Sequence, residues 1–411
     1  MSCIKDISLA PSGELKIKWV EKNMPVLRGI GEDFLKEKPF KGLKVALSVH
    51  LEAKTAYLCR VMEMGGAEMY VTGSNPLSTQ DDVAAALAAG GMQVFARYGC
   101  SMEEYEDCLC KVLEVGPNII IDDGGDLVHL MHTKYRELIP NVIGGCEETT
   151  TGIHRLRAMA NAGTLLFPMV MVNEADCKHM FDNRYGTGQS VWDAIMRTTN
   201  LIVAGKYAVV SGYGWCGKGV ALRAKGMGAK VIITETDPVR ALEAVMDGYE
   251  VMPMSEAAKL GDMFITVTGC SGIITAEHFG LMKDGAILTN AGHFDVEVDI
   301  AALREIAVES YEARHNIQAY VIPGGKTLYV IAEGRLVNLA AGDGHPAEIM
   351  DMSFAVQALS AEMLAKQGKE FKPGVVHFPR ELDEAVAHRK LRAMGVEMDS
   401  LSKEQADYLG L

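Results

Sequence analysis

Short runs of β-branched and other apolar residues alternate with helix-like stretches along most of this chain, and this alternation restricts the possible fold most. Parallel strands cannot be joined by a tight turn and need a long crossover, which is usually a helix. The order therefore predicts a parallel sheet covered by helices. The predicted strands of the first series are 44–49, 67–72, 92–96, 118–122 and one within 165–172, and the predicted helices are 52–64, 80–89, 102–114 and 126–138.

A second series of the same kind begins near the middle of the chain. This is the element order of a doubly wound nucleotide domain. We therefore expect an α/β fold of two doubly wound parallel-sheet domains joined by a hinge, followed by a C-terminal helical segment. The predicted strands of the second series are 207–212, 230–235, 263–269, 286–292 and 327–335.

Two segments are expected to connect these domains. Residues 183–205 predict a glycine-rich turn that feeds a helix, in which Val191, Ile195 and Met196 share an apolar face. Residues 342–368 predict a long amphipathic helix that crosses back to pack on the first domain. The expected domains are 1–183 with 346–385, then 184–345, and a segment for assembly at 386–411.

Composition and charge exclude several classes of protein. The 40 basic and 54 acidic residues give a net charge of −14, spread along the chain, and this field would repel nucleic acid and anionic membranes. No signal-peptide core is present, and no apolar stretch approaches the roughly 20 residues of a membrane span. Nine scattered cysteines form no C-x-x-C pair, so reduced thiols, no bound metal and a cytoplasmic location are expected.

The stretch VVSGYGWCGKG at 209–219 has the G-x-G-x-x-G spacing of a dinucleotide loop. It follows a predicted strand, precedes a helix predicted at 217–227, and the next strand ends in Glu235. The glycines would let a pyrophosphate approach the helix N-terminus, and Glu235 would bind ribose hydroxyls and repel a 2′-phosphate. These features predict NAD rather than NADP, although Arg240 lies close by; a nucleotide-free glycine turn is the alternative.

Acidic residues follow the predicted strand at 118–122, where parallel sheets bind their ligands. Asp122, Asp123 and Asp126 surround two glycines there. Helix capping explains Asp122 and Asp126 as well as catalysis does, so Asp123 is the candidate for chemistry.

Two further stretches carry clustered polar groups. GGCEETTTG (144–152) places two carboxylates and three threonines before a helix predicted near Ile153, which is more than capping requires. Lys178 and Asp182 have the i, i+4 spacing of one helix face, for which an exposed salt bridge is the alternative interpretation. A lysine in a closed cleft could lose its proton by desolvation and act as a base.

Three histidines lie where the two domains could face each other. His50 follows the strand at 44–49, His293 follows the strand within 286–292, and His345 lies at the proposed crossover. A single histidine is more often structural, but three at such positions favour a site.

The motifs DDGGD, EETTTG, FDNRYG, VSGYGWCGKG, NAGHFDVEVD and AEGRLVNLAAGDGHP occur together, and with them the chain resembles the S-adenosyl-L-homocysteine hydrolases from about residue 8 onward. The resemblance implies a substrate-binding N-terminal domain, a central NAD-binding domain and a homotetramer. It also implies reversible NAD-dependent hydrolysis of S-adenosyl-L-homocysteine to adenosine and homocysteine through a 3′-keto intermediate, in the S-adenosylmethionine cycle.

Residue roles follow from the resemblance alone. Lys178 would take the 3′-hydroxyl proton, with Asp182 and Glu148 binding the ribose hydroxyls. Asp123 and His50 would handle the C4′ proton, the sulfur and the water, and His293 and His345 would also meet the substrate. The implied cofactor residues are Thr149, Thr150, Thr151, Asn183, Gly212, Gly214, Trp215, Cys216, Gly217, Lys218, Gly219, Glu235, Arg240, Ala291, Gly292, His293, Asn338 and His345.

The chain departs from many relatives at the purine-binding motif. The sequence HLEAKT places Glu52 and Lys54 where a threonine and a glutamate or glutamine are usual. An acidic acceptor beside a cationic donor suits hypoxanthine at least as well as adenine, so S-inosyl-L-homocysteine is the alternative substrate. Thr187 also stands where many relatives have cysteine.

Other expectations concern NAD retention and rival functions. The sequence ends at DYLGL without the longer tail of many relatives, which predicts looser NAD retention. An NAD dehydrogenase with net hydride transfer is a more remote alternative. A non-catalytic NAD-binding subunit is disfavoured because Lys178, Asp182, Asp123 and His293 occur together.

Overall fold

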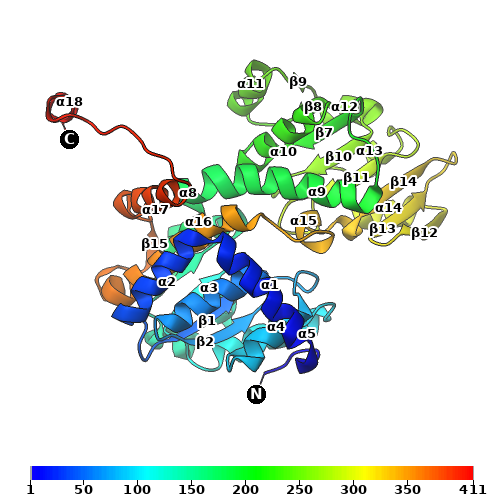
Figure 1. Cartoon of the computed structure of the whole chain (residues 1–411). Coiled ribbons are helices and arrows are strands. Elements are labelled where there is room, and N and C mark those ends of the chain that lie inside the picture. The colour runs from blue at the N-terminus through cyan, green and yellow to red at the C-terminus, as the bar shows by residue number, and fades with distance from the viewer. Residues whose placement is uncertain (1, 411) are drawn as a thin grey trace.

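The computed structural model describes residues 2–410, which form two domains built around separate sheets (Figure 1). The first sheet has the strand order β15-β6-β5-β4-β1-β2-β3, and all of its strand pairs are parallel. Its strands are β1 (Lys44–Ser48), β2 (Glu68–Thr72), β3 (Gln93–Phe95), β4 (Ile119–Asp122), β5 (Gly144–Glu147), β6 (Pro168–Met171) and β15 (Gly374–Val376). Its helices include α1 (Ala10–Asn23), α2 (Pro25–Glu37), α3 (Ala53–Met64), α4 (Asp81–Ala89), α5 (Met102–Leu113), α6 (Asp126–Thr133) and α7 (Thr150–Asn161).

The α/β prediction is confirmed, with local corrections. Residues 144–147 form β5, a strand that the glycine-rich sequence did not suggest. The following helix, α7, begins at Thr150 rather than near Ile153. α6 ends at Thr133, and a 3₁₀ turn covers 136–141 where a longer helix was expected.

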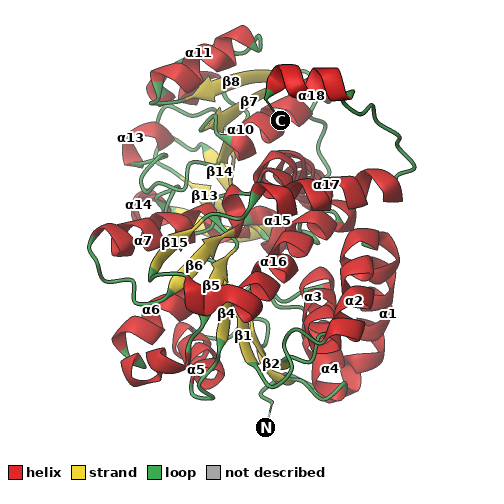
Figure 2. Cartoon of the chain, turned by 90° about the vertical axis from the view of Figure 1, so that its left-hand side faces the viewer, coloured by secondary structure: helices red, strands yellow, loops and turns green. Residues whose placement is uncertain are grey.

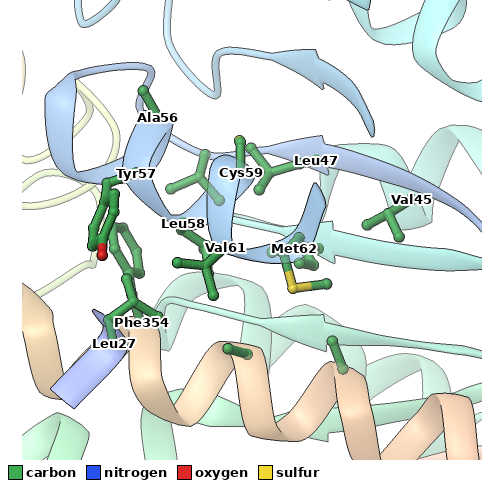
Figure 3. Close-up of a cluster of buried hydrophobic side chains, with 14 of the residues drawn as sticks. Leu27, Val45, Leu47, Ala56, Tyr57, Leu58, Cys59, Val61, Met62 and Phe354 are labelled. Atoms are coloured by element: carbon green, nitrogen blue, oxygen red, sulfur yellow. The ribbon is translucent and has the colours of Figure 1, made fainter. Parts of the chain in front are cut away.

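A buried apolar cluster joins α2, α3 and β1 to a helix from the other end of the chain (Figure 3). Val45 and Leu47 lie on one face of β1, because side chains alternate along a strand. They pack with Leu58 of α3, and Phe354 extends the cluster from α16 (Ala347–Gln367). Each such side chain contributes about 1.5–3 kcal/mol to folding when fully buried.

The second sheet has the order β12-β13-β14-β11-β10-β7-β8-β9. It is parallel from β14 to β9, but β12, β13 and β14 pair antiparallel. This hairpin was not predicted, because every residue of β12 is exposed and the sequence carries no apolar pattern there. The strands are β7 (Tyr207–Ser211), β8 (Lys230–Thr234), β9 (Glu250–Val251), β10 (Met263–Thr266), β11 (Ile287–Asn290), β12 (Glu309–Arg314), β13 (Ile317–Val321) and β14 (Thr327–Ile331), and the helices are α10 (Trp215–Gly226), α11 (Pro238–Met246), α12 (Met254–Leu260), α13 (Ala276–Phe279), α14 (Ile300–Ile306) and α15 (Val337–Ala340).

The forward connection between the domains is helical throughout. α8 (Asp176–Lys178), a π-helical turn η4 (His179–Gly186) and α9 (Thr187–Thr199) follow one another directly, so the predicted glycine-rich turn is wrong. Gly188 serves close packing instead: a Cβ there would lie 2.6 Å from the Gly219 carbonyl oxygen. Val191 and Ile195 are buried as predicted, whereas Met196 is 39% exposed and does not share their face.

The chain returns to the first domain through α16, which confirms the predicted crossover. α16 contacts β4 and β5 as well as α2 and α3 (Figure 2). α17 (Arg380–Ala393) packs on α2 and α16, while α18 (Lys403–Leu409) projects from the body (Figure 1). Among residues 2–410 no helix combines the length and apolarity needed to cross a membrane, and all nine cysteines are free.

Candidate active site

A cleft is lined by residues from both domains and from the two connections between them. All of the predicted catalytic and substrate residues meet there, together with part of the predicted cofactor set. The predicted residues that line it are His50, Glu52, Lys54, Asp123, Glu148, Thr149, Thr150, Lys178, Asp182, Asn183, Cys216, Ala291, His293, Asn338 and His345. The predicted residues outside this lining are Thr151, Gly212, Gly214, Trp215, Gly217, Lys218, Gly219, Glu235, Arg240 and Gly292.

Lys178 lies at the centre of a buried polar cluster. Its Nζ donates to Asn173 Oδ1 at 2.9 Å and to Asn183 Oδ1 at 3.0 Å. Asp182 Oδ2 lies 3.4 Å from the same Nζ and Glu148 Oε1 3.6 Å from it. The exposed salt bridge considered for Lys178 and Asp182 is therefore wrong, because both side chains are buried. π-Helical turns often occur at functional sites, and this one supplies Asp182 and Asn183.

The charges in this cluster stabilise one another. Burial alone would lower the pKa of Lys178, but Asp182 and Glu148 outweigh it and raise that pKa, so the expected desolvated neutral lysine is wrong for this arrangement. Burial raises the pKa of Glu148 to about 8, against the opposing effect of Lys178. For Asp182, burial is outweighed by Lys178 and His345, which hold its pKa well below the usual range.

α16 contributes two polar side chains that the sequence analysis missed. Ser353 Oγ donates to Asp182 Oδ2 at 2.7 Å, and Gln357 Nε2 donates to Glu148 Oε2 at 2.6 Å. Both residues are fully buried, four positions apart in a helix rich in methionine and alanine. That spacing of polar residues within an apolar helix was a signal that could have identified them.

A second cluster surrounds Asp123, which follows β4. Asp123 Oδ2 accepts from Ser74 Oγ at 3.0 Å and lies 3.4 Å from His50 Nε2, while His293 Nδ1 lies 3.9 Å from Asp123 Oδ1. His50 Nδ1 is 2.7 Å from Ser78 Oγ. Burial lowers the pKa of His50 to about 4, so a neutral imidazole faces Asp123 at neutral pH.

Helix capping and catalysis were the two interpretations of Asp122 and Asp126, and the contacts of both residues are structural. Asp122 accepts from the backbone N–H groups of Asp123 and Val128 at 3.1 and 2.9 Å, and so joins the strand end to the start of α6. Asp126 pairs with Arg155 at 2.7 Å. Neither lines the cleft.

Glu52 and Lys54 form a buried ion pair in the lining of the cleft. Lys54 Nζ lies 2.7 Å from Glu52 Oε2 and donates to the Asp343 carbonyl at 2.9 Å. Glu52 also accepts from the backbone N–H groups of Lys54 and Thr55, which caps α3. One acceptor and one donor are thus held rigidly side by side.

The glycine loop fits a dinucleotide. α10 begins at Trp215, two residues earlier than predicted, with Gly214 as its N-cap residue, so the free N–H groups of its first turn face the loop. A Cβ on Gly217 would lie 1.9 Å from the Gly212 carbonyl oxygen, and only glycine allows this tight turn. Glu235 accepts from the Tyr213 N–H at 2.7 Å, which brings its carboxylate to the loop.

Further groups lie at the cleft end of this domain. The buried Asn338 Oδ1 has no hydrogen-bond partner among the described residues, which fits an amide donor of nicotinamide. His345 bonds to Asp182, and its Nε2 lies 3.3 Å from Thr187 Oγ1, so Thr187 belongs to the cleft as well. The residues present are therefore suited to NAD.

A glycine loop at a helix N-terminus, facing buried acid–base groups of a second α/β domain, defines an NAD-dependent enzyme. Residues 183–344 match the family model described as S-adenosyl-L-homocysteine hydrolase, NAD binding domain, and residues 1–137 match S-adenosyl-L-homocysteine hydrolase. The chain belongs to the S-adenosyl-L-homocysteine hydrolase family, as the motifs predicted, and NAD is its cofactor.

Relatives of two activities are similar to the chain along its whole length. The adenosylhomocysteinases of Thermococcus kodakarensis and Aquifex aeolicus are each 58% identical, over 99% of this chain and 97% of their own. The S-inosyl-L-homocysteine hydrolase of Methanococcus maripaludis is 57% identical, over 100% of this chain and 98% of its own. The prediction of a thioether hydrolase is confirmed at the level of the family.

Proposed function

We propose that this chain catalyses the reversible NAD-dependent hydrolysis of S-adenosyl-L-homocysteine to adenosine and L-homocysteine, in the S-adenosylmethionine cycle. The observation that carries the proposal is the convergence of two buried clusters, around Lys178 and Asp123, on one cleft that His293 reaches from the NAD-binding domain. Those clusters suit two separate proton transfers on one ribose ring.

The chemistry follows from the difficulty of breaking a thioether bond beside a saturated carbon. Bound NAD supplies the temporary oxidation of the ribose 3′-hydroxyl to a ketone and its later reversal. Beside that ketone the C4′ proton is acidic, and the homocysteine thiolate can leave from C5′. Water then adds to C5′, and the ring is reduced again.

Lys178 is assigned to the 3′-hydroxyl proton. Because its ammonium is stabilised by carboxylates, it must first pass a proton to Glu148, 3.6 Å away, before it can accept one. With a pKa of about 8, Glu148 is ionised in a minority of molecules at neutral pH, and it is this ionised form that takes the proton from Lys178. Asp182, fixed by Ser353 and His345, stays ionised and accepts from the ribose hydroxyls.

Asp123 and His50 are assigned to the C4′ proton, the departing sulfur and the incoming water, with His293 closing the other side. The short separations within this group allow one water molecule to contact all three side chains. The neutral His50 imidazole can accept a proton from that water.

We assign the parts of NAD to residues of the glycine loop and of the cleft. Glu235 and Arg240 are assigned to the adenosine half of NAD, the glycine loop to the pyrophosphate, and Thr149 to Thr151 with Asn183, Asn338 and His345 to the nicotinamide half. The domain roles proposed are substrate binding for 1–183 with 346–385, NAD binding for 184–345, and assembly for 386–411. We also propose a cytoplasmic homotetramer that binds neither nucleic acid nor membranes.

S-Inosyl-L-homocysteine is the second candidate substrate, and the Glu52–Lys54 pair favours considering it. Hypoxanthine presents N1–H as a donor and O6 as an acceptor, which the carboxylate and the ammonium can each bind. Adenine reverses this order, with N1 as acceptor and the amino group as donor, and the same pair can bind it as well.

The test is incubation of the purified protein, with its NAD, with each nucleoside thioether, while released homocysteine thiol is measured. We expect thiol release from the adenosine compound with the higher kcat/KM. A higher kcat/KM for the inosine compound would make that compound the substrate. NADH accumulating in solution without thiol would instead identify a dehydrogenase and overturn the proposal.

A further inference from the structure

Glu147 is a buried acidic residue that the catalytic assignment leaves unused. It ends β5, its side chain is fully buried, and it lies opposite Asp122 in the parallel register of β4 and β5. Buried carboxyl groups are costly unless backbone or side-chain donors satisfy them, so this position requires an explanation.

One carboxyl oxygen of Glu147 joins two loops of the cleft. Oε1 accepts from the Gly124 N–H at 2.9 Å and from the Thr149 N–H at 3.0 Å. Gly124 directly follows Asp123, and Thr149 directly follows Glu148. This atom therefore links the loop that carries Asp123 to the loop that carries Glu148, in addition to the direct bond from the Glu148 N–H to the Asp122 carbonyl at 2.9 Å.

The same carboxyl group occupies the place of a side chain in α7. A Cβ on Gly152 would lie 2.1 Å from Glu147 Cδ, so glycine in this first helical turn leaves room for it. Thr149 is the N-cap residue of α7, yet its side chain makes no capping bond. Glu147 binds the Thr149 N–H, and the Thr149 side chain, which caps no N–H group of the helix, lines the cleft.

Gly124 also packs directly against the His293 ring. A Cβ on Gly124 would be 2.7 Å from His293 Nε2. The orientation of the Gly124 peptide therefore determines where this histidine of the NAD-binding domain can approach Asp123.

We propose that Glu147 is a positioning residue, which holds the loops after β4 and β5 in register so that Asp123, His293 and Glu148 meet on one substrate. This inference rests on the proposed function of the cleft. Glu147 contacts no reacting atom in this assignment, since it does not line the cleft, and it acts through the two backbone groups that it binds.

The protonation state of Glu147 makes glutamine the conservative substitute. Burial raises its pKa well above the usual value, and Asp122 and Asp123 add to this effect, which favours the neutral carboxyl group. A glutamine retains the carbonyl oxygen that both N–H groups need, whereas methionine has a similar length and no comparable acceptor.

The test compares Glu147→Gln, Glu147→Met and Gly152→Ala in the NAD-loaded full chain. We expect Glu147→Gln to retain kcat within about five-fold, and Glu147→Met to lose about 100-fold in kcat with a small change in KM, because displacement of reacting groups by about 1 Å has such an effect. Gly152→Ala leaves Glu147 in the sequence but pushes its carboxyl group away, so it should resemble the methionine variant.

Asp351→Leu is the matched control, because Asp351 also accepts two backbone N–H groups, of Val26 and Leu27, outside the cleft. It should lower the thermal midpoint without changing kcat. Hydrogen exchange of the Gly124 and Thr149 amides gives a readout that is independent of turnover. We expect this exchange to be fast in Glu147→Met and slow in Glu147→Gln and in the wild-type protein.

Wild-type kcat and slow exchange in Glu147→Met or Gly152→Ala would overturn the inference, as would a glutamine variant as impaired as the methionine variant. Failure of the wild-type protein to release thiol would overturn the proposed function alone, since the exchange measurement still tests whether Glu147 holds these loops.

Discussion

Gly124 and His293 face each other across the two domains, so closely that a single added methyl group on Gly124 would lie 2.7 Å from the His293 ring nitrogen Nε2. Gly124 follows the catalytic candidate Asp123, and His293 reaches it from the NAD-binding domain. The contact means that the acid–base group around Asp123 is complete only when the domains meet.

A Gly124→Ala substitution should therefore impair turnover more than folding. The backbone of Gly124 has a φ of +106°, which costs an alanine about 1–2 kcal/mol, and the methyl group also displaces His293. We expect at least a ten-fold loss of kcat in the thiol-release assay. Gly163→Ala is the control: it has a φ of +68° and no neighbour near the added Cβ, so it should lose stability but not activity.

Lys178→Ala should abolish turnover while NAD remains bound. Loss of a general base typically costs 10²- to 10⁴-fold, and we expect a loss of about 1,000-fold in kcat. Lys178 does not belong to the glycine loop, so NAD released by acid denaturation should remain near one per chain. A variant that lost its NAD along with its activity would contradict the role assigned here.

Gln357→Leu should move the pH dependence of activity. The Gln357 amide lowers the pKa of Glu148, so its removal raises that pKa above about 8. Glu148 must be ionised to accept the Lys178 proton, so activity rises with pH through this pKa, and the acidic limb of the kcat profile should shift upward by about one pH unit. An unchanged limb would remove Glu148 from the proton path.

Glu235→Gln should weaken the discrimination between NAD and NADP. The amide keeps an acceptor for the Tyr213 N–H but removes the charge that repels a 2′-phosphate. We expect NAD affinity to fall by less than about ten-fold, while NADP binding becomes measurable by calorimetry. NADP binding to the unmodified protein with equal affinity would show that Glu235 does not select the cofactor.

Local patterns explain how much of the fold could be predicted. The strands β1 to β4, β7, β8, β10 and β11 were predicted closely because each contains a buried apolar run, whereas the two-residue β9 was not predicted and β5 was missed because Gly144 and Gly145 carry no such signal. β12 was missed for the opposite reason, since an exposed edge strand need not be apolar. In the connection at 183–199, glycines suggested a turn, but they permit close helix packing.

Single motifs likewise identified residues but not their partners. The sequence identified Lys178, Asp182, Glu148, Asp123 and His50 as candidates, yet it did not connect Ser353 or Gln357 to them. Those two residues lie about 170 to 210 positions from the carboxylates they bind, a separation that only the return of α16 closes.

The amino-acid sequence by itself determined the two α/β series, the glycine loop, the choice of NAD and the family, because each depends on residue types at short spacings. Tertiary structure alone decided the charge of Lys178, the structural roles of Asp122 and Asp126, and the supporting position of Glu147. These properties depend on burial and on charges from distant segments, and both exist only once the two domains and α16 have packed together.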